Sequence, residues 1–443
     1  MNTLEIGTIN LNGSENWLQV IGKGRHPLLA SAKYLRRISG LPEVEEELEL
    51  FFRGSPAELQ SILMTFYGFA EAAEQDQPGL PVLFLRRMAE GEAYFSPVLK
   101  LGLEEKLEPF DKLGLGTLGL KLTLRRKNHY ESAETELPLT LPGGSSQTGG
   151  VLLYNHSDGH NGHHAVAAVN TAGFHSGLPV SLRTELTNPY NGEPLGKVLL
   201  GLLVCGVMGY FPKLEFEAEA AGSNTVPSAS ESGGAYLPFS WSGNQWTTLF
   251  SCRISDVDAA ILGATALLPL LRLRERPAES GLQFRLRISA EGALLAQTMP
   301  VGLGVQGNLL QLPSLRLLQR ALPGVELPAE MQIELQVISS APGAHALEPD
   351  ALRLLPQSGY LVFTALTGLA YGGKLMDDPI RGRCWGKLAG HELQSHNRFG
   401  TELFIPPSQY GRLFLCGEDL SGRAAIERTF LLRVWGRKRR QIL

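Results

Sequence analysis

The sequence predicts a mainly β protein in which a β domain with one helix is followed by an antiparallel β-sandwich of the jelly-roll kind. Three observations lead to this fold class. Short stretches of alternating apolar and polar residues recur over most of the 443 residues, as in strands with one buried face. The 50 glycines and 27 prolines supply the turns that many short strands need. Long helical patterns are scarce, and this combination is typical of sandwiches.

Length and charge restrict the classes of function. A chain of 443 residues is expected to form two or three domains, and its 43% hydrophobic residues provide for several cores. The formal net charge of -4 gives no overall field that attracts nucleic acid. The dense basic run Arg437–Arg440 is typical of a solvated segment. We therefore expect no nucleic-acid sequence recognition.

Cysteine use and hydropathy indicate an intracellular place of synthesis. The cysteines, Cys205, Cys252, Cys384 and Cys416, are far apart and form no C-x-x-C pair, so neither disulfides nor a zinc site is predicted. The N-terminal residues lack the basic-then-apolar pattern of a signal peptide. The most apolar stretch, Ala259–Leu273, is too short to span a membrane, so membrane insertion is not expected.

The clearest helix start follows a strand-like stretch at Val44–Phe52, in which Glu and Leu alternate. Ser55 is placed to cap a helix, Pro56 occupies the first helical position, and Glu58 follows three residues after the cap. Apolar residues then recur at helical spacing at Leu59, Ile62, Leu63 and Phe66. We expect a helix over about residues 55–68 whose apolar face lies across a sheet.

Further alternating stretches complete a first domain over residues 1–141. They are expected as strands at Val82–Arg86, Pro97–Leu103, Leu118–Leu124 and Glu136–Leu141. The segment at residues 142–150, PGGSSQTGG, has the composition of a linker, and we place a domain boundary there.

Residues 151–363 are predicted to form the sandwich. Its alternating stretches include Val180–Thr187, Lys197–Cys205, Leu214–Ala220, Trp246–Ile254, Leu282–Ser289 and Met331–Val337. Residues 364–443 hold further strands, notably Arg412–Cys416 and Phe430–Trp435. Periodicity leaves two possibilities for this segment, a third small domain or a return to pair with the N-terminal domain.

Two motif matches fail on structural context. Gly114–Gly119 fits G-x-G-x-x-G, but a dinucleotide site needs a helix after the glycines and a strand-like run follows here. His391 and His396 come close to the zinc-helix motif, yet at i and i+5 they do not share a helical face. No nucleophile-elbow, Walker-A or paired-carboxylate motif is present. We therefore predict no catalytic, cofactor-binding or metal-ligating residues and expect a protein that is not an enzyme.

The richest polar cluster lies in one loop. Its members are Asn155, His156, Asp158, His160, His163 and His164. Imidazoles and a carboxylate suit a metal, and the Asp and Asn side chains suit sugar hydroxyls. The ordinary alternative is a surface turn, in which Asn, Asp and Gly supply backbone freedom and the histidines are solvated.

Trp241 and Trp246 flank a short polar stretch and form a second candidate. Together with Asn155, His156 and Asp158 they would place a stacking floor beside hydrogen-bonding groups for a sugar ring. Such tryptophans are more commonly core or interface anchors. These five residues are therefore candidates for glycan binding. For the polar loop and for the tryptophans alike, an ordinary structural role is the alternative.

The N-terminal third resembles the distal tail proteins of long-tailed phages and related contractile injection machines. Three stretches carry the resemblance: Asn16–Leu18 in an early strand, ELELFFRGSPAELQSILMTFYG around the expected helix, and LGLKLTLRRKNHYESAETELPLT at the end of the domain. This share of the chain is of ordinary domain size.

The later part of the chain is similar to the sandwich domains of bacterial phage-like tail proteins. The opening of the sandwich carries this similarity at Asn155–Asp158 and Leu178–Asn188. The final stretch carries it at Tyr360–Val362, Asp377–Asp378, Pro406–Ser408, Arg412–Cys416 and Val434–Arg437.

The resemblance implies a tube-like N-terminal β domain that forms a ring, usually a hexamer, and a peripheral galectin-like or carbohydrate-module-like sandwich. It implies a structural virion component that joins the tail tube to the tail tip or baseplate hub. Such a protein is assembled in the host cytoplasm and resides in the virion tail. A ring needs exposed strand edges and self-complementary surface rather than acids, bases or a metal.

Two other functions stay open. A carbohydrate-binding tail module would contact host surface glycans through the tryptophans and the polar loop, and Trp246→Ala would abolish its binding. A glycan-processing enzyme built on the sandwich would need a carboxylate pair roughly 5–10 Å apart in a cleft. Sandwiches host all three roles, so the fold class does not choose among them.

Overall fold

The computed structural model describes most of the chain. The described residues are 4–6, 9–10, 19–21, 33–35, 43–74, 84–89, 92–108, 116–155, 163–171, 179–217, 224–262, 265–277, 281–302, 307–316, 330–378, 383–388, 391–395 and 397–440. They are nearly all β, in several antiparallel sheets, which confirms the predicted mainly β fold class. The chain divides into unit 1 (Met1–Thr135, Phe174–Val180 and Gly436–Leu443) and unit 2 (Glu136–Gly173 and Ser181–Trp435).

Unit 1 is built on one antiparallel sheet. Its strands are β1 (Leu4–Ile6), β2 (Ile9–Asn10), β3 (Gln19–Ile21), β4 (Lys33–Leu35), β5 (Glu43–Gly54), β6 (Phe84–Ala89), β7 (Glu92–Glu108), β8 (Gly116–Lys127), β9 (Tyr130–Ser132) and β39 (Arg439–Arg440). The strand order is β2-β1-β6-β7-β8-β5-β3; β4 pairs with β5, β9 with β7, and β39 with β9.

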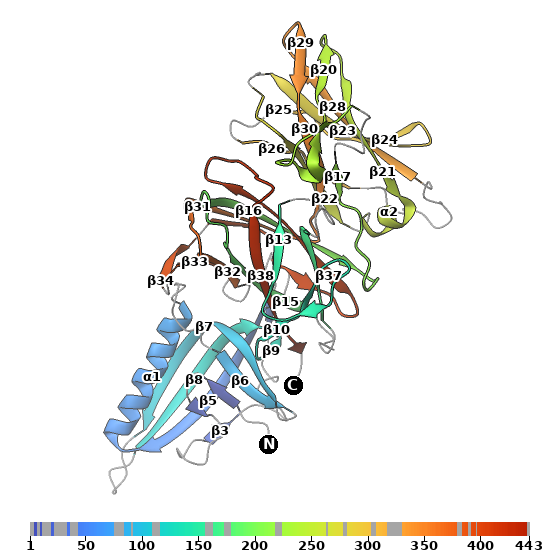
Figure 1. Ribbon diagram of the computed structural model, residues 1–443. Helices are drawn as coiled ribbons and strands as arrows, with labels where there is room; N and C mark the ends of the chain where they lie inside the picture. The colour runs from blue at the N-terminus through green and yellow to red at the C-terminus, as the bar shows by residue number, and fades with distance from the viewer. Residues whose placement is uncertain are drawn as a thin grey trace. The chain divides into compact units, whose positions relative to one another are not determined.

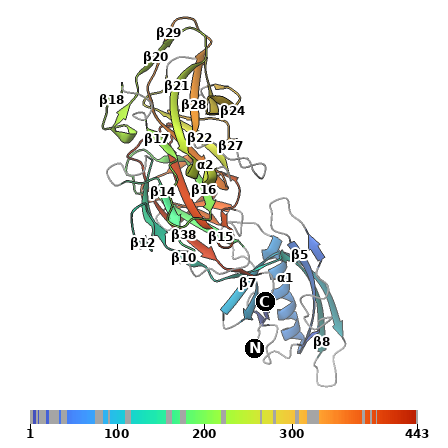
Figure 2. The ribbon, with the colours of Figure 1, turned by 90° about the vertical axis from the view of Figure 1, so that its right-hand side faces the viewer.

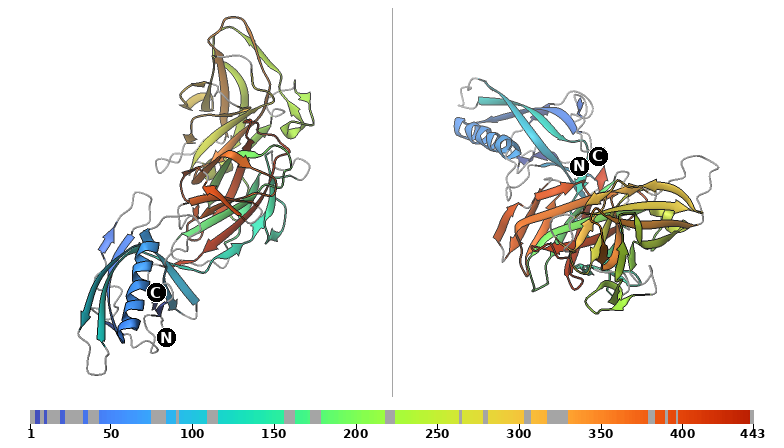
Figure 3. Two further views of the ribbon diagram at one scale, coloured as in Figure 1. Left: turned by 90° about the vertical axis from the view of Figure 1, so that its left-hand side faces the viewer. Right: turned by 90° about the horizontal axis from the view of Figure 1, so that it is seen from above.

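A helix, α1 (Pro56–Glu74), packs on this sheet. Figures 1 and 2 show it lying lengthwise along β5, β7 and β8, and Figure 3 shows the same packing from two other directions. It begins where the sequence predicts, because the Glu58 carboxylate accepts hydrogen bonds from the Ser55 N–H and hydroxyl, each 2.8 Å long. It runs past the predicted end at residue 68, because Phe69, Ala70 and Ala73 also pack against the core.

The long strands of unit 1 have one apolar and one charged face. On β5, Leu48, Leu50 and Phe52 are buried, and Phe52 contacts the ring of Phe66 from α1 at a centroid distance of 5.8 Å. The residues between them point to the opposite face, as strand geometry requires. We call that side the charged face of unit 1, and it is formed by Glu45, Glu47, Glu49, Lys121 and Arg125.

The smaller unit contains both an early and a late part of the chain. In the register of β9 and β39, Glu131 pairs with Arg439 and Tyr130 with Arg440. The backbone N–H of Ser132 also donates to the carbonyl of Lys438 at 2.9 Å. Residues 136–435, most of which form unit 2, are therefore inserted between two segments of unit 1 that are hydrogen-bonded to each other.

Two antiparallel sheets of unit 2 form a sandwich. The first contains β10 (Thr135–Leu137), β13 (Val151–Tyr154), β15 (Val180–Thr187), β32 (Lys374–Asp378), β33 (Arg383–Leu388), β34 (His391–Ser395), β36 (Phe404–Ile405) and β38 (Thr429–Arg437). The second contains β11 (Leu139–Thr140), β12 (Ser146–Gln147), β14 (Val166–Val169), β16 (Leu195–Cys205), β31 (Gly359–Leu369), β35 (Asn397–Gly400) and β37 (Tyr410–Asp419).

Close packing between the two sheets requires a glycine on β37. A Cβ placed on Gly417 would lie 2.4 Å from the ring of Phe430, which is fully buried on β38 of the other sheet. Phe430 therefore fills the space that a larger residue at position 417 would need, and this contact is part of the sandwich core.

A large insertion lies between β16 and β31. One of its sheets contains β17 (Glu215–Glu217), β22 (Ala266–Leu273), β26 (Leu309–Gln311), β27 (Leu315–Arg316) and β30 (Pro349–Pro356), and another contains β21 (Thr247–Ser255), β23 (Leu282–Ala290), β24 (Ala293–Gln297), β25 (Val301–Gly302) and β28 (Glu330–Ser339). Two short pairs join β18 (Val226–Pro227) to β19 (Ala235–Tyr236) and β20 (Phe239–Ser242) to β29 (Ala344–Leu347). The short helix α2 (Asp256–Leu262) completes it.

The insertion shares one hydrophobic core with the sandwich. All eight residues of β30 are buried, so this strand is covered on both faces. Val166, Leu199 and Phe414 of the sandwich belong to the same buried cluster as Leu270 and Leu352 of the insertion. This is why residues 206–358 are part of unit 2 and do not form a third one.

The structure places two predicted segments differently from the sequence analysis. Residues 142–150, expected as an interdomain linker, form a turn inside unit 2, with β12 paired to β11 and the chain passing between the units at Thr135. Residues 364–435 complete the sandwich, since β37 pairs with β14 and β16 while β38 pairs with β13. Gly436–Leu443 belongs to unit 1. These pairings join strands that are distant in sequence, and periodicity does not encode them.

Candidate functional site

Asn155 is a buried structural residue. Its side chain is 3% exposed. Its amide Nδ2 donates to the carbonyls of Gly417 at 2.6 Å and Ala425 at 3.2 Å, and its Oδ1 accepts from the Gly417 N–H at 2.8 Å. All of these partners are backbone groups, so the amide ties β13 to the facing sheet. This corrects the expectation that Asn155 offers its amide to a sugar, because the buried amide already forms its hydrogen bonds within the fold.

The rest of the predicted polar loop is only partly described. His156, Asp158 and His160 lie outside the described residues. The His163 ring stacks on Tyr154 of β13 at a centroid distance of 3.8 Å. His164 is partly buried, and burial lowers its pKa. The described histidines thus pack against the sandwich.

Trp241 does not form an open stacking floor. It lies on β20, is 8% exposed, and packs between Phe239 at 5.7 Å and His345 of β29 at 5.1 Å, both as centroid distances. The sugar-stacking prediction required an accessible ring face. This corrects the prediction for Trp241, since the hydrophobic side chain belongs to the insertion core.

Trp246 precedes β21 and is half-buried. The guanidinium of Arg285 lies 4.1 Å from its ring centroid, a cation–π arrangement, and Arg285 Nε donates to Gln336 at 2.9 Å. One face of this indole is therefore covered by a protein side chain. Its part in glycan binding stays a prediction.

The two rejected motifs lie in strands where they are described. Gly116 begins β8, as the alternating pattern indicated, and His391 begins β34, whereas His396 lies outside the described residues. Among the described residues, no group of three or more His, Cys, Asp or Glu is placed to hold a metal ion. None of the described helices has the length and apolarity needed to cross a membrane.

A buried ion-pair network joins the first and the last chain segment of unit 1. Arg439 Nε donates to Glu131 Oε1 at 2.7 Å, Arg437 lies 3.5 Å from Glu131 Oε2, and His129 Nε2 is 3.1 Å from Oε1. Burial acts to raise the pKa of Glu131, but the His129 contact and the arginine charges outweigh it and lower the pKa to about 2. Burial also lowers the pKa of His129. We call these four residues the clasp.

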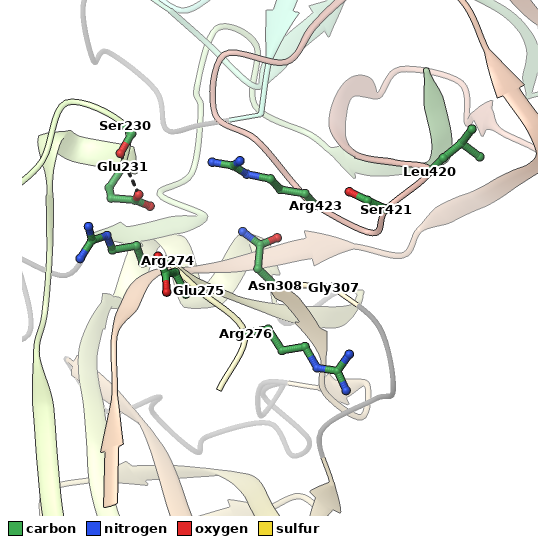
Figure 4. A pocket seen from close by; sticks show the side chains of 10 residues that line it. All are labelled: Ser230, Glu231, Arg274, Glu275, Arg276, Gly307, Asn308, Leu420, Ser421 and Arg423. Atoms are coloured by element: carbon green, nitrogen blue, oxygen red, sulfur yellow. Dashed lines mark hydrogen bonds between the residues drawn. The ribbon is translucent and has the colours of Figure 1, made fainter. Parts of the chain in front are cut away.

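A pocket of about 600 Å³ lies within unit 2, where the insertion meets the sandwich. Four chain segments line it: the turn before the 3₁₀ turn Ser232–Gly234, the bend after β22, the residues before β26, and the turn after β37. The lining residues, shown in Figure 4, are Ser230, Glu231, Arg274, Glu275, Arg276, Gly307, Asn308, Leu420, Ser421 and Arg423. The lining is thus dominated by charged and polar side chains.

Arg272 of β22 contacts the pocket residue Glu231. The Arg272 side chain is 6% exposed; its Nε donates to the Ala424 carbonyl at 2.7 Å and its guanidinium contacts the carboxylate of Asp350. Glu231 Oε2 lies 3.4 Å from the same guanidinium. Asp350 is fully buried, and burial raises its pKa to about 8 against the opposing effect of Arg272. One arginine therefore connects the turn after β37 to two buried acids.

Asn308 holds the opposite side of the same turn. Its Oδ1 accepts from the Ala424 N–H at 2.8 Å and its carbonyl accepts from the Leu273 N–H at 2.8 Å. The side-chain Nδ2 is buried and has no hydrogen-bond partner in the described part of the chain. Only 6% of Asn308 is exposed. A donor is thus left over at the pocket wall, and such a group is costly unless something accepts its hydrogen bond.

The turn that carries Arg423 is rigid. Asp419 Oδ1 accepts from the Ser421 hydroxyl at 2.7 Å and from the Arg423 N–H at 2.8 Å, and the Asp419 N–H donates back to the Arg423 carbonyl at 3.0 Å. The Arg423 side chain is exposed, and Figure 4 shows it extending toward Ser230 and Glu231. The fold therefore fixes the backbone of this residue and presents its guanidinium to the pocket.

Comparisons with known proteins do not assign the chain to a family. No protein-family model and no curated protein matches it. It is similar at 10% identity to the VP2 subviral particle of infectious bursal disease virus, over 76% of this chain and 79% of that one, with a TM-score of 0.18. It is also similar to a structure of the Gx strain of that virus, at 10% identity over 70% and 81%, with a TM-score of 0.15. Superpositions at these TM-scores do not establish a shared fold.

The sequence analysis did not select any pocket residue. Arg274, Glu275 and Arg276 lie together after an apolar strand, and their charge was the available local signal. Their neighbours Glu231 and Arg423 are far away in the sequence, so no spacing motif links them. Only the pairing of distant strands brings the set together.

Proposed function

We propose that the protein is a structural component of a phage-like virion tail, in which unit 1 closes into a ring, expected to be a hexamer, with copies of itself. In this proposal the ring joins the tail tube to the tail tip or baseplate hub, and the sandwich of unit 2 is the peripheral part. Assembly takes place in the host cytoplasm, and the mature protein resides in the virion tail.

The connectivity of the two units is the observation that carries this proposal. Unit 1 contains Met1–Thr135, Phe174–Val180 and Gly436–Leu443, so the chain crosses between the units four times, and two of these crossings, after Thr135 and before Gly436, follow and precede paired strands of unit 1. The Ser132 N–H and the Lys438 carbonyl bond at 2.9 Å beside these crossings. A force that acts on unit 2 through these two crossings is then carried by two chain segments that are hydrogen-bonded to each other. This arrangement suits a scaffold that carries a peripheral domain.

The charged face of unit 1 offers a surface for self-association. Glu45, Glu47 and Glu49 lie on β5, opposite Arg125, Thr123 and Lys121 of β8 in the strand register. Lys121 Nζ is 3.6 Å from Glu47, and both side chains are about two-fifths exposed. Charges of both signs in one row can meet the same row of a neighbouring copy, which favours a defined register between copies.

Electron microscopy combined with light scattering tests the proposal. We expect closed rings of about six copies, either from the purified chain or after addition of its cognate tail-tube protein. A double variant, Glu47→Lys with Glu49→Lys, should prevent ring closure, whereas Glu330→Gln, which changes an exposed acid on β28 of unit 2, should not. A chain that stays monomeric at all concentrations, with and without tube protein, contradicts the proposal.

Glycan binding through the five predicted residues has less support. Asn155 and Trp241 are buried in the fold, as described above. Trp246 has one ring face covered by Arg285. The structural proposal does not depend on any of these side chains.

A further inference from the structure

The pocket of unit 2 has the size of a small-molecule site. Its volume of about 600 Å³ lies within the range of roughly 300–1,000 Å³ that is usual for bound ligands. Unlike most such sites it is lined by three arginines, two glutamates, two serines and an asparagine, with Leu420 as its one large apolar side chain among the described lining residues. A ligand that fits this lining must itself be strongly polar.

Two donors at the pocket are available to an acceptor. Asn308 Nδ2 is buried and unpartnered in the described part of the chain. Arg423 is exposed on a rigid turn, and among the described residues its guanidinium forms no ion pair. Arg274, in contrast, already pairs with Glu348 at 3.3 Å. A guanidinium and an amide that present N–H groups together suit an anionic oxygen group.

Acceptors also line the pocket. Glu231 is 3% exposed, and its Oε1 accepts from the Ser230 hydroxyl at 3.0 Å. Ser421 supplies a further hydroxyl, and Glu275 is an exposed carboxylate. Carboxylates and hydroxyls of this kind bind the hydroxyl groups of a ligand. The lining therefore suits a molecule that carries both an anion and several hydroxyls.

The pocket is held in place by a close approach of two loops. Gly307 has φ +90°, and a Cβ there would lie 2.2 Å from the Gly422 carbonyl oxygen. Arg272 and Asn308 fasten the same turn through Ala424. Because both walls are fixed before a ligand arrives, binding there requires little ordering of the protein.

We propose that this pocket binds an anionic group carried on a polyhydroxylated carbon chain, with Arg423 and Asn308 contacting the anion and Glu231 contacting hydroxyls. A carboxylated sugar and a phosphorylated polyol both have this chemistry. The proposal goes beyond the ring function and does not depend on it, because every residue of the pocket lies in unit 2.

Calorimetric titration of the full chain tests the proposal with four probes: glucuronate, glycerol 3-phosphate, inorganic phosphate and neutral glucose. We expect saturable binding of glucuronate or glycerol 3-phosphate at least tenfold tighter than that of glucose. Glucuronate alone identifies a sugar acid as the natural class, and glycerol 3-phosphate alone identifies a phosphorylated polyol. Inorganic phosphate that binds as tightly as both of them contradicts the role of the hydroxyls.

Two pocket variants and one control test whether the probes bind at this pocket. Arg423→Gln removes the guanidinium, and Asn308→Asp replaces the free donor while keeping the acceptor for Ala424. Each should weaken binding about tenfold or more, whereas Arg253→Gln, an exposed arginine on β21, should not change it. Unchanged binding in Arg423→Gln overturns the proposal, as does the absence of saturable binding of both anionic polyols up to about 10 mM. Ring formation, measured on the same samples, should be unaffected by all three variants.

Discussion

Glu131 of β9 and Arg439 of β39 are register partners in one sheet and also form a buried ion pair, with Arg439 Nε 2.7 Å from Glu131 Oε1. The two residues are 308 positions apart. The side chains thus reinforce the backbone pairing that closes unit 1 around the insertion of unit 2.

Loss of the Glu131 charge should loosen this closure. Glu131→Gln leaves the buried Arg439 without its carboxylate, and breaking such a pair costs about 3–5 kcal/mol. Hydrogen exchange of a peptide that spans residues 130–132 should accelerate strongly. Glu134→Gln is the matched control, because Glu134 pairs with Arg437 at 3.0 Å but is partly exposed, and its loss should cost under about 1 kcal/mol. Equal exchange in both variants argues against the clasp.

The clasp should weaken in acid. The pKa of Glu131 is lowered to about 2 in the folded protein from an ordinary value of 4.5. A lowered acid pKa stabilises the fold above the ordinary value, and the contribution is lost as the pH falls from about 4.5 toward 2. Its full size is on the order of 3 kcal/mol. Hydrogen exchange at β9 measured from pH 5 to pH 3, corrected for intrinsic rates, should rise in the native chain and stay flat in Glu131→Gln.

The buried pair of Asp350 and Arg272 should respond to pH in the opposite sense. Burial raises the pKa of Asp350 to about 8, so between its ordinary value of 3.8 and about 8 the folded state holds a proton that the unfolded state has released. Stability is therefore greatest at the acid end of this window and falls as the pH rises toward 8. Urea unfolding followed by tryptophan fluorescence should show this decline in the native chain and a shallower one in Asp350→Asn. Glu330→Gln should keep the native slope.

Asn155 should matter for stability. Its amide makes three hydrogen bonds to the backbone of Gly417 and Ala425. Asn155→Leu leaves those groups buried and unpaired, at a cost of about 2–4 kcal/mol. Asn244→Leu changes an exposed asparagine in the same unit and should have little effect. If Asn155→Leu unfolds at the native urea concentration, the amide does not tie the two sheets together.

Two glycine substitutions can separate the steric effect of the close loop contact at Gly307 from the effect of backbone strain. Gly307→Ala meets both a positive φ of +90° and a carbonyl 2.2 Å from the new Cβ, whereas Gly292→Ala meets a φ of +79° with nothing within 4 Å. Strain alone costs about 1–2 kcal/mol. Gly307→Ala should destabilise by about 1–3 kcal/mol more, through overpacking. Equal unfolding midpoints for the two variants would show that the loops have room to separate.

The sequence predicts local structure well where one chemical rule applies. The capping residues Ser55 and Glu58 predict the start of α1, and the alternation of apolar with polar or small residues predicts β5 and β8. The assignment of β37 and β38 to the sandwich was not predictable, because their partners lie more than two hundred residues earlier. Local pattern encodes which face of a strand is buried and not which strand lies beside it.

Candidate functional sites were harder to predict from the sequence than secondary-structure elements. Asn155 has a side chain that suits turns and ligand sites equally, and only the buried backbone groups around it show that it serves the core. The pocket unites Glu231, Asn308 and Arg423 from three separate turns. None of them belongs to a motif, since each residue type is common on protein surfaces.

The insertion of unit 2 inverts the order in which the two units can be completed during synthesis. Unit 2 ends at Trp435, but β9, which pairs with β7 on one side, gains its partner on the other side only when β39 has emerged, 308 residues after Glu131. At about 5–20 residues per second the ribosome needs roughly 15–60 s for that stretch. The earliest part of the nascent chain therefore waits with an unpaired sheet margin until the later unit has formed, and only chains extended past β38 can present a closed unit 1.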